Sequence, residues 1–297
     1  MRFYSRLAAL VLIALSLAMP GIATAAAPKK AEAAKAVKAK AKPAVKKKAH
    51  YSAKKKVSRH ASISGKKALK RVAAHESFRS RLAAPEVAAP QALLLNSSAA
   101  VVFNESNGEV LYSKNNTATM PIASITKLLT AMVVLDAKLP MDEVISIGEA
   151  DVDTLRNTGS RLPVGTTMTR AETMLLMLMS SENRAASALA RHYPGGASAF
   201  IARMNRKAAA IGMKNARFYD SSGLNGGNVA TAADLVHLVQ AAHDYPEIRE
   251  FSTTPSHELL LANGRRLMYN NTNSLVKDDD WQIGLQKTGF INEAGKC

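Results

Sequence analysis

The first residues that could do chemistry are a serine and a lysine three positions apart. They lie in the segment Ser124-Ile125-Thr126-Lys127. Residues three apart on a helix share a face, so the lysine amine can reach the serine hydroxyl. A serine hydroxyl is a weak nucleophile until an adjacent base takes its proton, and a lysine with a lowered pKa can be that base. The N-terminus of a helix also favours negative charge developing on the serine oxygen.

The same Ser-x-x-Lys spacing occurs three more times, and sequence context selects among the matches. It recurs at Ser52/Lys55, Ser64/Lys67 and Ser274/Lys277. The first two pairs lie in a basic segment without an apolar pattern to hold them, and the third lies in a polar, Asn-rich stretch. Only Ser124 opens an apolar helical pattern, formed by Ile125, Leu128, Leu129, Met132 and Leu135. Ser124 is therefore the candidate nucleophile and Lys127 its base.

Two further motifs follow in order. Ser181-Glu182-Asn183 begins 57 residues after Ser124, and Lys287-Thr288-Gly289 begins 104 residues after Asn183. Together with Ser-x-x-Lys, these motifs resemble the set of penicillin-binding proteins and β-lactamases. The segments 121–130, 218–224 and 287–295 resemble D-alanyl-D-alanine carboxypeptidases and endopeptidases, the low-molecular-mass penicillin-binding proteins. The resemblance covers about residue 92 to the end, and it is closest to the endopeptidases.

This resemblance implies catalytic roles for Ser124, Lys127 and Ser181 and a substrate-binding role for Asn183. Ser124 would attack a D-alanyl carbonyl and form an acyl-enzyme, while Lys127 takes its proton. Ser181 would relay a proton to the leaving amine. Asn183 would orient Lys127 and the substrate amide. The implied substrates are peptidoglycan stem peptides and cross-links, and β-lactams are the implied covalent inhibitors.

The resemblance also implies that the third motif, Lys287-Thr288-Gly289, and the following Phe290 bind the substrate. Lys287 would offset negative charge and help to hold the substrate carboxylate, and Thr288 would hydrogen-bond that carboxylate. The backbone N–H groups of Ser124 and Phe290 would form the oxyanion hole. Gly289 is expected to allow close strand packing. Glu182 is expected to face solvent.

Periodicity and turn residues predict a mixed α+β fold for residues 91–297. Strands are expected at 99–103, 109–112, 258–261, 265–269 and 282–288, with Asn-Gly turns inside the two hairpins. Helices are expected at 124–136, 173–179, 198–211 and 231–242, the last with a Thr-Asp capping pair. The resemblance makes this a β-lactamase/transpeptidase-like fold, in which helices flank an antiparallel sheet.

The chain divides by composition into three segments. Residues 1–25 carry two arginines, a short apolar run and an Ala-Thr-Ala cleavage pattern, which predict a signal peptide and export across the inner membrane to the periplasm. Residues 26–90 are rich in Ala, Lys and Pro and are expected to be disordered. Residues 26–86 hold 19 Lys/Arg against three Glu, which accounts for most of the net charge of +17. This basic segment is either a spacer or a contact for an anionic wall or membrane surface.

Two departures from the family pattern affect these expectations. Phe290-Ile291 replaces the His-Thr often found after Lys-Thr-Gly in the carboxypeptidases, so carboxypeptidase action remains an alternative to endopeptidase action. Family members continue with further strands and a C-terminal helix beyond the position of Cys297. The resemblance therefore implies a truncated domain that folds poorly, and a cooperative thermal transition of residues 90–297 alone would contradict this.

Other classes of function have less support in the sequence. A class A β-lactamase needs a deacylating Glu after the Ser-x-Asn motif, and no Glu occurs between Asn183 and Glu247. A nucleic-acid-binding tail is disfavoured by the export signal and by the lack of aromatic residues among the lysines. An inactive wall-binding homologue is disfavoured by the intact motifs. One cysteine and scattered histidines predict no metal site, and no cofactor is expected.

Overall fold

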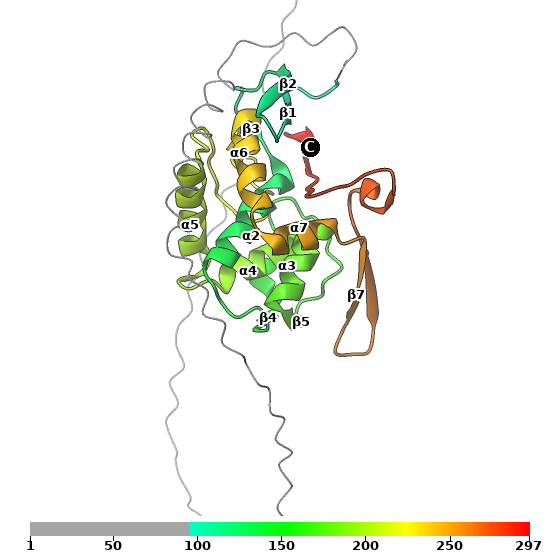
Figure 1. The fold of residues 1–297 in the computed structure, drawn as a ribbon. Helices are drawn as coiled ribbons and strands as arrows, with labels where there is room; N and C mark the ends of the chain where they lie inside the picture. The colour runs from blue at the N-terminus through cyan, green and yellow to red at the C-terminus, as the bar shows by residue number, and fades with distance from the viewer. Residues whose placement is uncertain (1–94) are drawn as a thin grey trace, which may run out of the picture. The chain divides into compact units, whose positions relative to one another are not determined.

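Helix α2 (Thr126–Asp136) lies at the centre of the computed structural model, which describes residues 95–297 (Figure 1). Its residues from Thr126 through Val134 are all buried. A helix buried on every side belongs to the interior of a core. Five further helices of the described residues pack against it: α3 (Arg170–Met179), α4 (Asn183–Arg191), α5 (Gly196–Ile211), α6 (Ala232–His243) and α7 (Pro246–Thr253). Lys127 therefore lies on a core helix.

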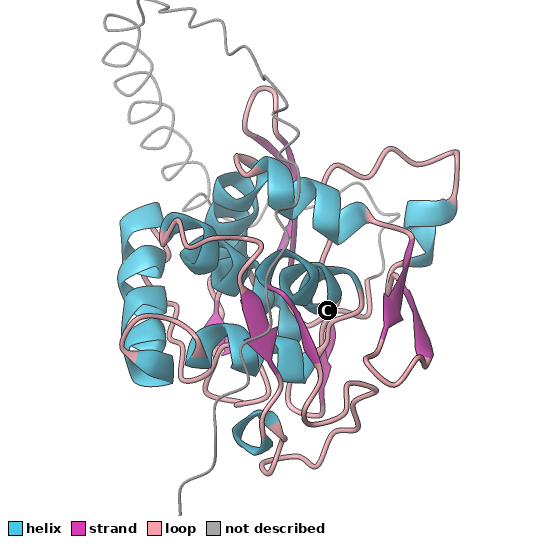
Figure 2. Cartoon of the chain, turned by 90° about the horizontal axis from the view of Figure 1, so that it is seen from below, coloured by secondary structure: helices cyan, strands magenta, loops and turns pink. Residues whose placement is uncertain are grey.

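The strands of residues 95–297 form antiparallel pairs rather than one continuous sheet. The pairs are β1 (Ala100–Asn104) with β2 (Glu109–Lys114), β3 (Met120–Pro121) with β6 (Val229–Ala230), β4 (Val144–Ser146) with β5 (Thr167–Thr169), β7 (Ser256–Leu260) with β8 (Arg266–Asn270), and β9 (Phe290–Ile291) with β10 (Gly295–Lys296). Figure 2 shows these short strands among the helices and loops. The mixed α+β class and the antiparallel pairing are as predicted. The strands form separate pairs, however, and not the single sheet that was expected.

Both Asn-Gly turns lie where the sequence predicts them. Gly108 and Gly264 have φ values of 70° and 80°, a conformation that glycine adopts without a steric penalty. The first turn joins β1 to β2, and the second joins β7 to β8. The β1–β2 pair packs on α6 through Val101, Phe103 and Val110, which contact Val236.

The predicted helices are confirmed with shifted ends. The helix expected from Ser124 begins as a turn of 3-10 helix, η1 (Ala123–Ile125), and continues as α2. The expected pair Thr231 and Asp234 forms a complete capping box at the start of α6. Helices α4 and α7 were not predicted. The buried face of α4 consists of four alanines and one leucine, Leu189.

The strand predicted over 282–288 is wrong. Residues 282–288 have no strand partner within the described part of the chain, and the nearest strand, β9, begins at Phe290. The Gln286 backbone N–H donates to the Ser252 hydroxyl instead of to a neighbouring strand. Gly289 does pair with Cys297 through two backbone hydrogen bonds, which extend the β9–β10 ladder by one step.

The predicted signal peptide and the basic segment up to residue 90 lie outside the described residues. Within residues 95–297, no helix has both the length and the apolar character to cross a membrane.

Candidate active site

Ser124 lies in the η1 turn that leads into α2. The preceding residue, Ala123, is fully buried and has a φ of 45°, a left-handed backbone conformation that residues other than glycine rarely adopt. Two glycines pack on this turn. A Cβ at Gly223 would collide with the Ala123 carbonyl, and a Cβ at Gly289 would lie 3.2 Å from the Ser124 backbone nitrogen. Gly289 therefore packs closely on the turn that carries Ser124.

Lys127 is fully buried beside Ser124. Its Nζ lies 2.7 Å from Ser124 Oγ, 2.8 Å from Asn183 Oδ1 and 2.7 Å from the Ser222 carbonyl oxygen. Desolvation by burial disfavours the charged amine and lowers the pKa of Lys127 from 10.5 to about 7. A large share of Lys127 is therefore neutral near pH 7, as a general base requires.

The partners of Lys127 determine where its protons lie. A neutral amine has two N–H donors and one lone pair. Asn183 Oδ1 and the Ser222 carbonyl can only accept, so they take both N–H groups and leave the lone pair for the Ser124 hydroxyl. The Asn183 amide is oriented from its other side, where Nδ2 donates to Thr158 Oγ1 over 3.3 Å. This arrangement can take the proton of Ser124.

Ser181 and Lys287, which come from separate motifs, are in direct contact. Lys287 Nζ donates to Ser181 Oγ over 2.9 Å and to the Thr288 carbonyl over 2.8 Å. Burial, and then the positive charge of Lys127, lower the pKa of Lys287 well below its usual value. Ser181 has a φ of 61°, a strained conformation of the kind that gathers at functional sites. A hydroxyl held by a buried amine can pass a proton.

Thr288 is linked to a residue that the sequence did not single out. Its Oγ1 donates to Thr272 Oγ1 over 2.7 Å, and the Thr272 backbone N–H donates to the Met179 carbonyl at the end of α3. Phe290 begins β9, and the residue is 62% exposed. Thr288 is thus fixed relative to the helix that precedes Ser181, while Phe290 presents an apolar surface to solvent.

The prediction that Glu182 faces solvent is wrong. Its side chain is buried, with 8% exposure, and its carboxylate accepts hydrogen bonds from the Ser160 hydroxyl and the Arg161 backbone N–H. A buried carboxylate needs such partners. The charges of Asp220 and, to a smaller extent, Glu182 raise the pKa of Lys127 against the larger effect of burial.

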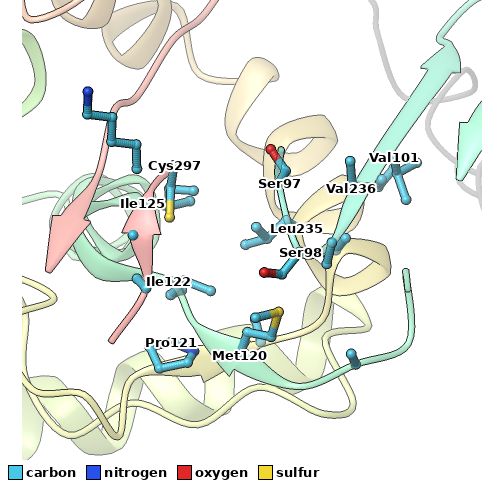
Figure 3. A pocket seen from close by; sticks show the side chains of 18 of the residues that line it. Ser97, Ser98, Val101, Met120, Pro121, Ile122, Ile125, Leu235, Val236 and Cys297 are labelled. Atoms are coloured by element: carbon cyan, nitrogen blue, oxygen red, sulfur yellow. The ribbon is translucent and has the colours of Figure 1, made fainter. Parts of the chain in front are cut away.

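A large apolar cavity of about 850 Å³ lies next to the η1 turn but does not contain its chemistry. Ile122 and Ile125 line the cavity together with Val101, Leu235 and Cys297 (Figure 3). Ser124 does not line it. The site described above is therefore defined by its polar contacts and not by this cavity. Within residues 95–297, no group of three or more His, Cys, Asp or Glu side chains is placed to hold a metal ion.

Two features of the site are those of an active-site serine peptidase. One is the serine–lysine pair at the start of a core helix, and the other is the motif of Ser181 and Asn183 beside it. Residues 86–297 match the family model described as D-alanyl-D-alanine carboxypeptidase. The chain belongs to this family.

Curated relatives from several bacteria support the assignment. A D-alanyl-D-alanine endopeptidase of Pseudomonas aeruginosa is 48% identical over 214 residues, which cover 72% of this chain and 69% of that protein. A D-alanyl-D-alanine endopeptidase of Escherichia coli is 46% identical, with 68% of this chain and 65% of that protein covered. The chain thus spans about two thirds of the length of these curated relatives.

Solved structures agree on the fold. The Streptomyces K15 DD-transpeptidase superposes with a TM-score of 0.63 at 28% identity, covering 71% of this chain and 85% of that chain. A D-alanyl-D-alanine carboxypeptidase of Mycobacterium tuberculosis gives a TM-score of 0.61 at 30% identity, covering 72% and 79%. The predicted transpeptidase-like fold class is therefore confirmed.

Proposed function

We propose that this chain is a serine-type D-alanyl-D-alanine endopeptidase that cleaves peptide cross-links of peptidoglycan. The observation that carries the proposal is the contact of a fully buried, low-pKa lysine amine with the hydroxyl of Ser124. Such a pair converts a weak hydroxyl into a nucleophile without a metal ligand or a histidine. Membership in the family supplies the substrate class.

Acylation would begin when neutral Lys127 takes the Ser124 proton and Oγ attacks the D-alanyl carbonyl carbon. The backbone N–H groups of Ser124 and Phe290 would stabilise the oxyanion. The C–N bond then breaks, and the departing amine receives a proton from Lys127 by way of the Ser181 hydroxyl. The acyl group stays on Ser124 as an ester.

Deacylation would repeat these proton transfers with water as the nucleophile. Water adds to the ester carbonyl as Lys127 takes its proton, and Ser124 leaves with a proton restored to its oxygen. Lys287 and Thr288 would hold the substrate carboxylate during the first half-reaction, since a buried amine and a hydroxyl both donate to such a group. Gly289 keeps this segment close to the η1 turn.

The relatives favour endopeptidase action over carboxypeptidase action. The three endopeptidases are 48%, 46% and 36% identical to this chain, whereas the carboxypeptidases shown by the same comparison are 28–32% identical. Phe290, in place of a histidine, also separates this chain from the usual carboxypeptidase sequence. Removal of the terminal D-alanine of a stem peptide is the second candidate function.

Digestion of purified cross-linked muropeptides tests this proposal. Endopeptidase action should produce two monomers whose summed mass exceeds that of the dimer by one water. Release of free D-alanine from an uncleaved dimer would instead establish carboxypeptidase action. A Ser124→Ala variant is the control for contaminating hydrolases, and no product of either kind from the folded wild type would contradict the proposal.

We make a separate proposal for residues 1–86. Residues 1–25 would direct export to the periplasm, and the basic residues 26–86 would contact an anionic wall or membrane surface, as their charge suggests. Deleting residues 26–86 should leave penicillin labelling of Ser124 intact and reduce sedimentation with isolated cell walls. Loss of labelling would show that the segment belongs to the enzyme. Binding of the intact chain to nucleic acid in preference to cell wall would favour the alternative of a nucleic-acid-binding tail.

A further inference from the structure

The loop of residues 218–228 supplies one of the three partners of Lys127, although it contains none of the three motifs. The Ser222 carbonyl accepts from Lys127 Nζ over 2.7 Å, and the neighbouring Ser221 carbonyl accepts from Thr130 Oγ1 over 2.7 Å. Both donors lie on α2, one helical turn from each other. Two consecutive carbonyls of the loop are therefore bound to the helix that carries the base.

The carboxylate of Asp220 holds this loop in shape. Its Oδ1 accepts from the backbone N–H groups of Ser222, over 2.9 Å, and Gly223, and from Asn228 Nδ2 over 3.1 Å. Its Oδ2 accepts from the Asn225 backbone N–H over 2.6 Å. A carboxylate that accepts several backbone N–H groups makes strong, charge-assisted bonds. The peptide unit that presents the Ser222 carbonyl is thus fixed on both sides by one side chain.

The same loop also holds the nucleophile. Gly223 has a φ of 86° and lies so close to Ala123 that any side chain there would collide with the Ala123 carbonyl. Asp220 binds the N–H of Gly223 directly. A change at Asp220 would therefore reach both Lys127, through Ser222, and Ser124, through the turn that begins at Ala123.

The charges around Lys127 come from three elements. Asp220, on the loop, exerts the largest influence of any charged neighbour and raises the pKa of Lys127, and Glu182, at the start of α4, has the next largest. Lys287, whose own pKa is lowered by Lys127, faces it from the segment before β9. Removing the Asp220 charge would leave Glu182 and Lys287 in place, and the balance would move toward the neutral amine.

We propose that Asp220 is a positioning residue for the base. Its carboxylate fixes the loop whose Ser222 carbonyl holds the Lys127 amine against Ser124, and its charge acts on that amine. The inference rests on the proposed function, because it assigns Asp220 to the same serine–lysine chemistry. A purely structural turn residue would affect folding alone, whereas this role also sets the pH at which the base becomes active.

The test compares Asp220→Asn with a matched control, Asp234→Asn, in the full chain. Asp234 is also a buried aspartate that accepts from backbone and hydroxyl groups, but it caps α6 and is not among the charges that act on Lys127. The rate of acylation by excess fluorescent penicillin is measured from about pH 5 to about pH 9. Each rate is divided by the folded fraction of that variant at the same pH, measured by circular dichroism, so that unfolding in acid does not move the midpoint.

Asp220→Asn should move the midpoint to lower pH by roughly one pH unit, the effect that one charge about 10 Å away exerts at an effective dielectric constant near 20. It should also lower the plateau rate roughly 10- to 100-fold, because the base is held less well. Asp234→Asn should keep the wild-type midpoint. An unchanged midpoint in Asp220→Asn, whatever its rate, would overturn the inference. If the folded wild type is not acylated at all, the proposed function fails first.

Discussion

Acidification should switch off acylation of Ser124 by protonating Lys127. The neutral amine is the active base, and its two N–H groups are already bound to Asn183 and Ser222. Protonation adds a third N–H where the lone pair faced the Ser124 hydroxyl, so the hydroxyl can no longer pass its proton to Lys127. The rate should therefore rise with pH through the pKa of Lys127 and then level.

The expected size of this effect follows from a pKa of about 7 for Lys127. The neutral share is about one half at pH 7, about one tenth at pH 6 and about one hundredth at pH 5. Acylation should thus slow about tenfold per pH unit below neutrality. A lysine with its ordinary pKa of 10.5 would instead give a rate that still rises above pH 9.

The assay follows covalent labelling by a fluorescent penicillin in excess, with samples denatured at intervals and resolved on a gel. Thermal denaturation at each pH is the control, because loss of folded protein in acid would imitate the effect. Titration of Lys287, whose pKa burial also lowers, would add a second step that Lys287→Met should remove. A rate that stays constant from about pH 5 to about pH 8 would refute the assignment of Lys127 as base.

Three other predictions concern single substitutions. Gly223→Ala should destabilise the fold by about 3 kcal/mol or more and abolish acylation, because the new Cβ would collide with the Ala123 carbonyl. The control is Gly165→Ala, which is also at positive φ but has open space around it. In thermal or urea denaturation this control should lose only about 1 kcal/mol of stability. Glu182→Gln should lower the midpoint of the acylation profile less than Asp220→Asn does, because its charge influences Lys127 less; an equal or larger shift would contradict the charge ranking. Lys127→Met should remove a pH-dependent part of stability. Between pH 7 and pH 10.5 the unfolded lysine keeps a proton that the folded one has lost, so the wild type should gain about 5 kcal/mol relative to the variant as pH rises through this window. Urea denaturation of both proteins at several pH values measures this difference, and parallel curves would refute it.

The nucleophile could be predicted because residues near Ser124 in the sequence form most of its surroundings. Ser124 lies in the η1 turn that leads directly into the apolar α2. In contrast, Lys277 of the pair Ser274/Lys277 lies in the short 3-10 helix η3 (Ser274–Lys277) and donates to the exposed Asn270 side chain. Glycine turns and helical periodicity likewise depend on neighbours a few residues away. These features are therefore available in the sequence before any contact is known.

The remainder of the site depends on contacts between distant segments. Lys127 and Ser222 are 95 positions apart, and neither periodicity nor turn chemistry indicates which carbonyl reaches the amine. Glu182 has the character of a surface residue in the sequence, and only the approach of Ser160 and Arg161 makes its burial possible. In the segment 282–288, Ile283 and Leu285 alternate with polar residues and glycine as in a strand. A strand also needs a partner, and local sequence does not encode where that partner lies.

Peptide mapping by mass spectrometry after penicillin treatment tests the central claim most directly. The wild-type chain should carry a long-lived penicilloyl adduct on Ser124 and on no other serine, because the sequence between Asn183 and Glu247 offers no glutamate to activate a deacylating water. Lys127→Met should show no adduct under the same conditions while it remains folded by circular dichroism. An unmodified Ser124 in folded wild-type protein, or an equal adduct in Lys127→Met, would contradict the account.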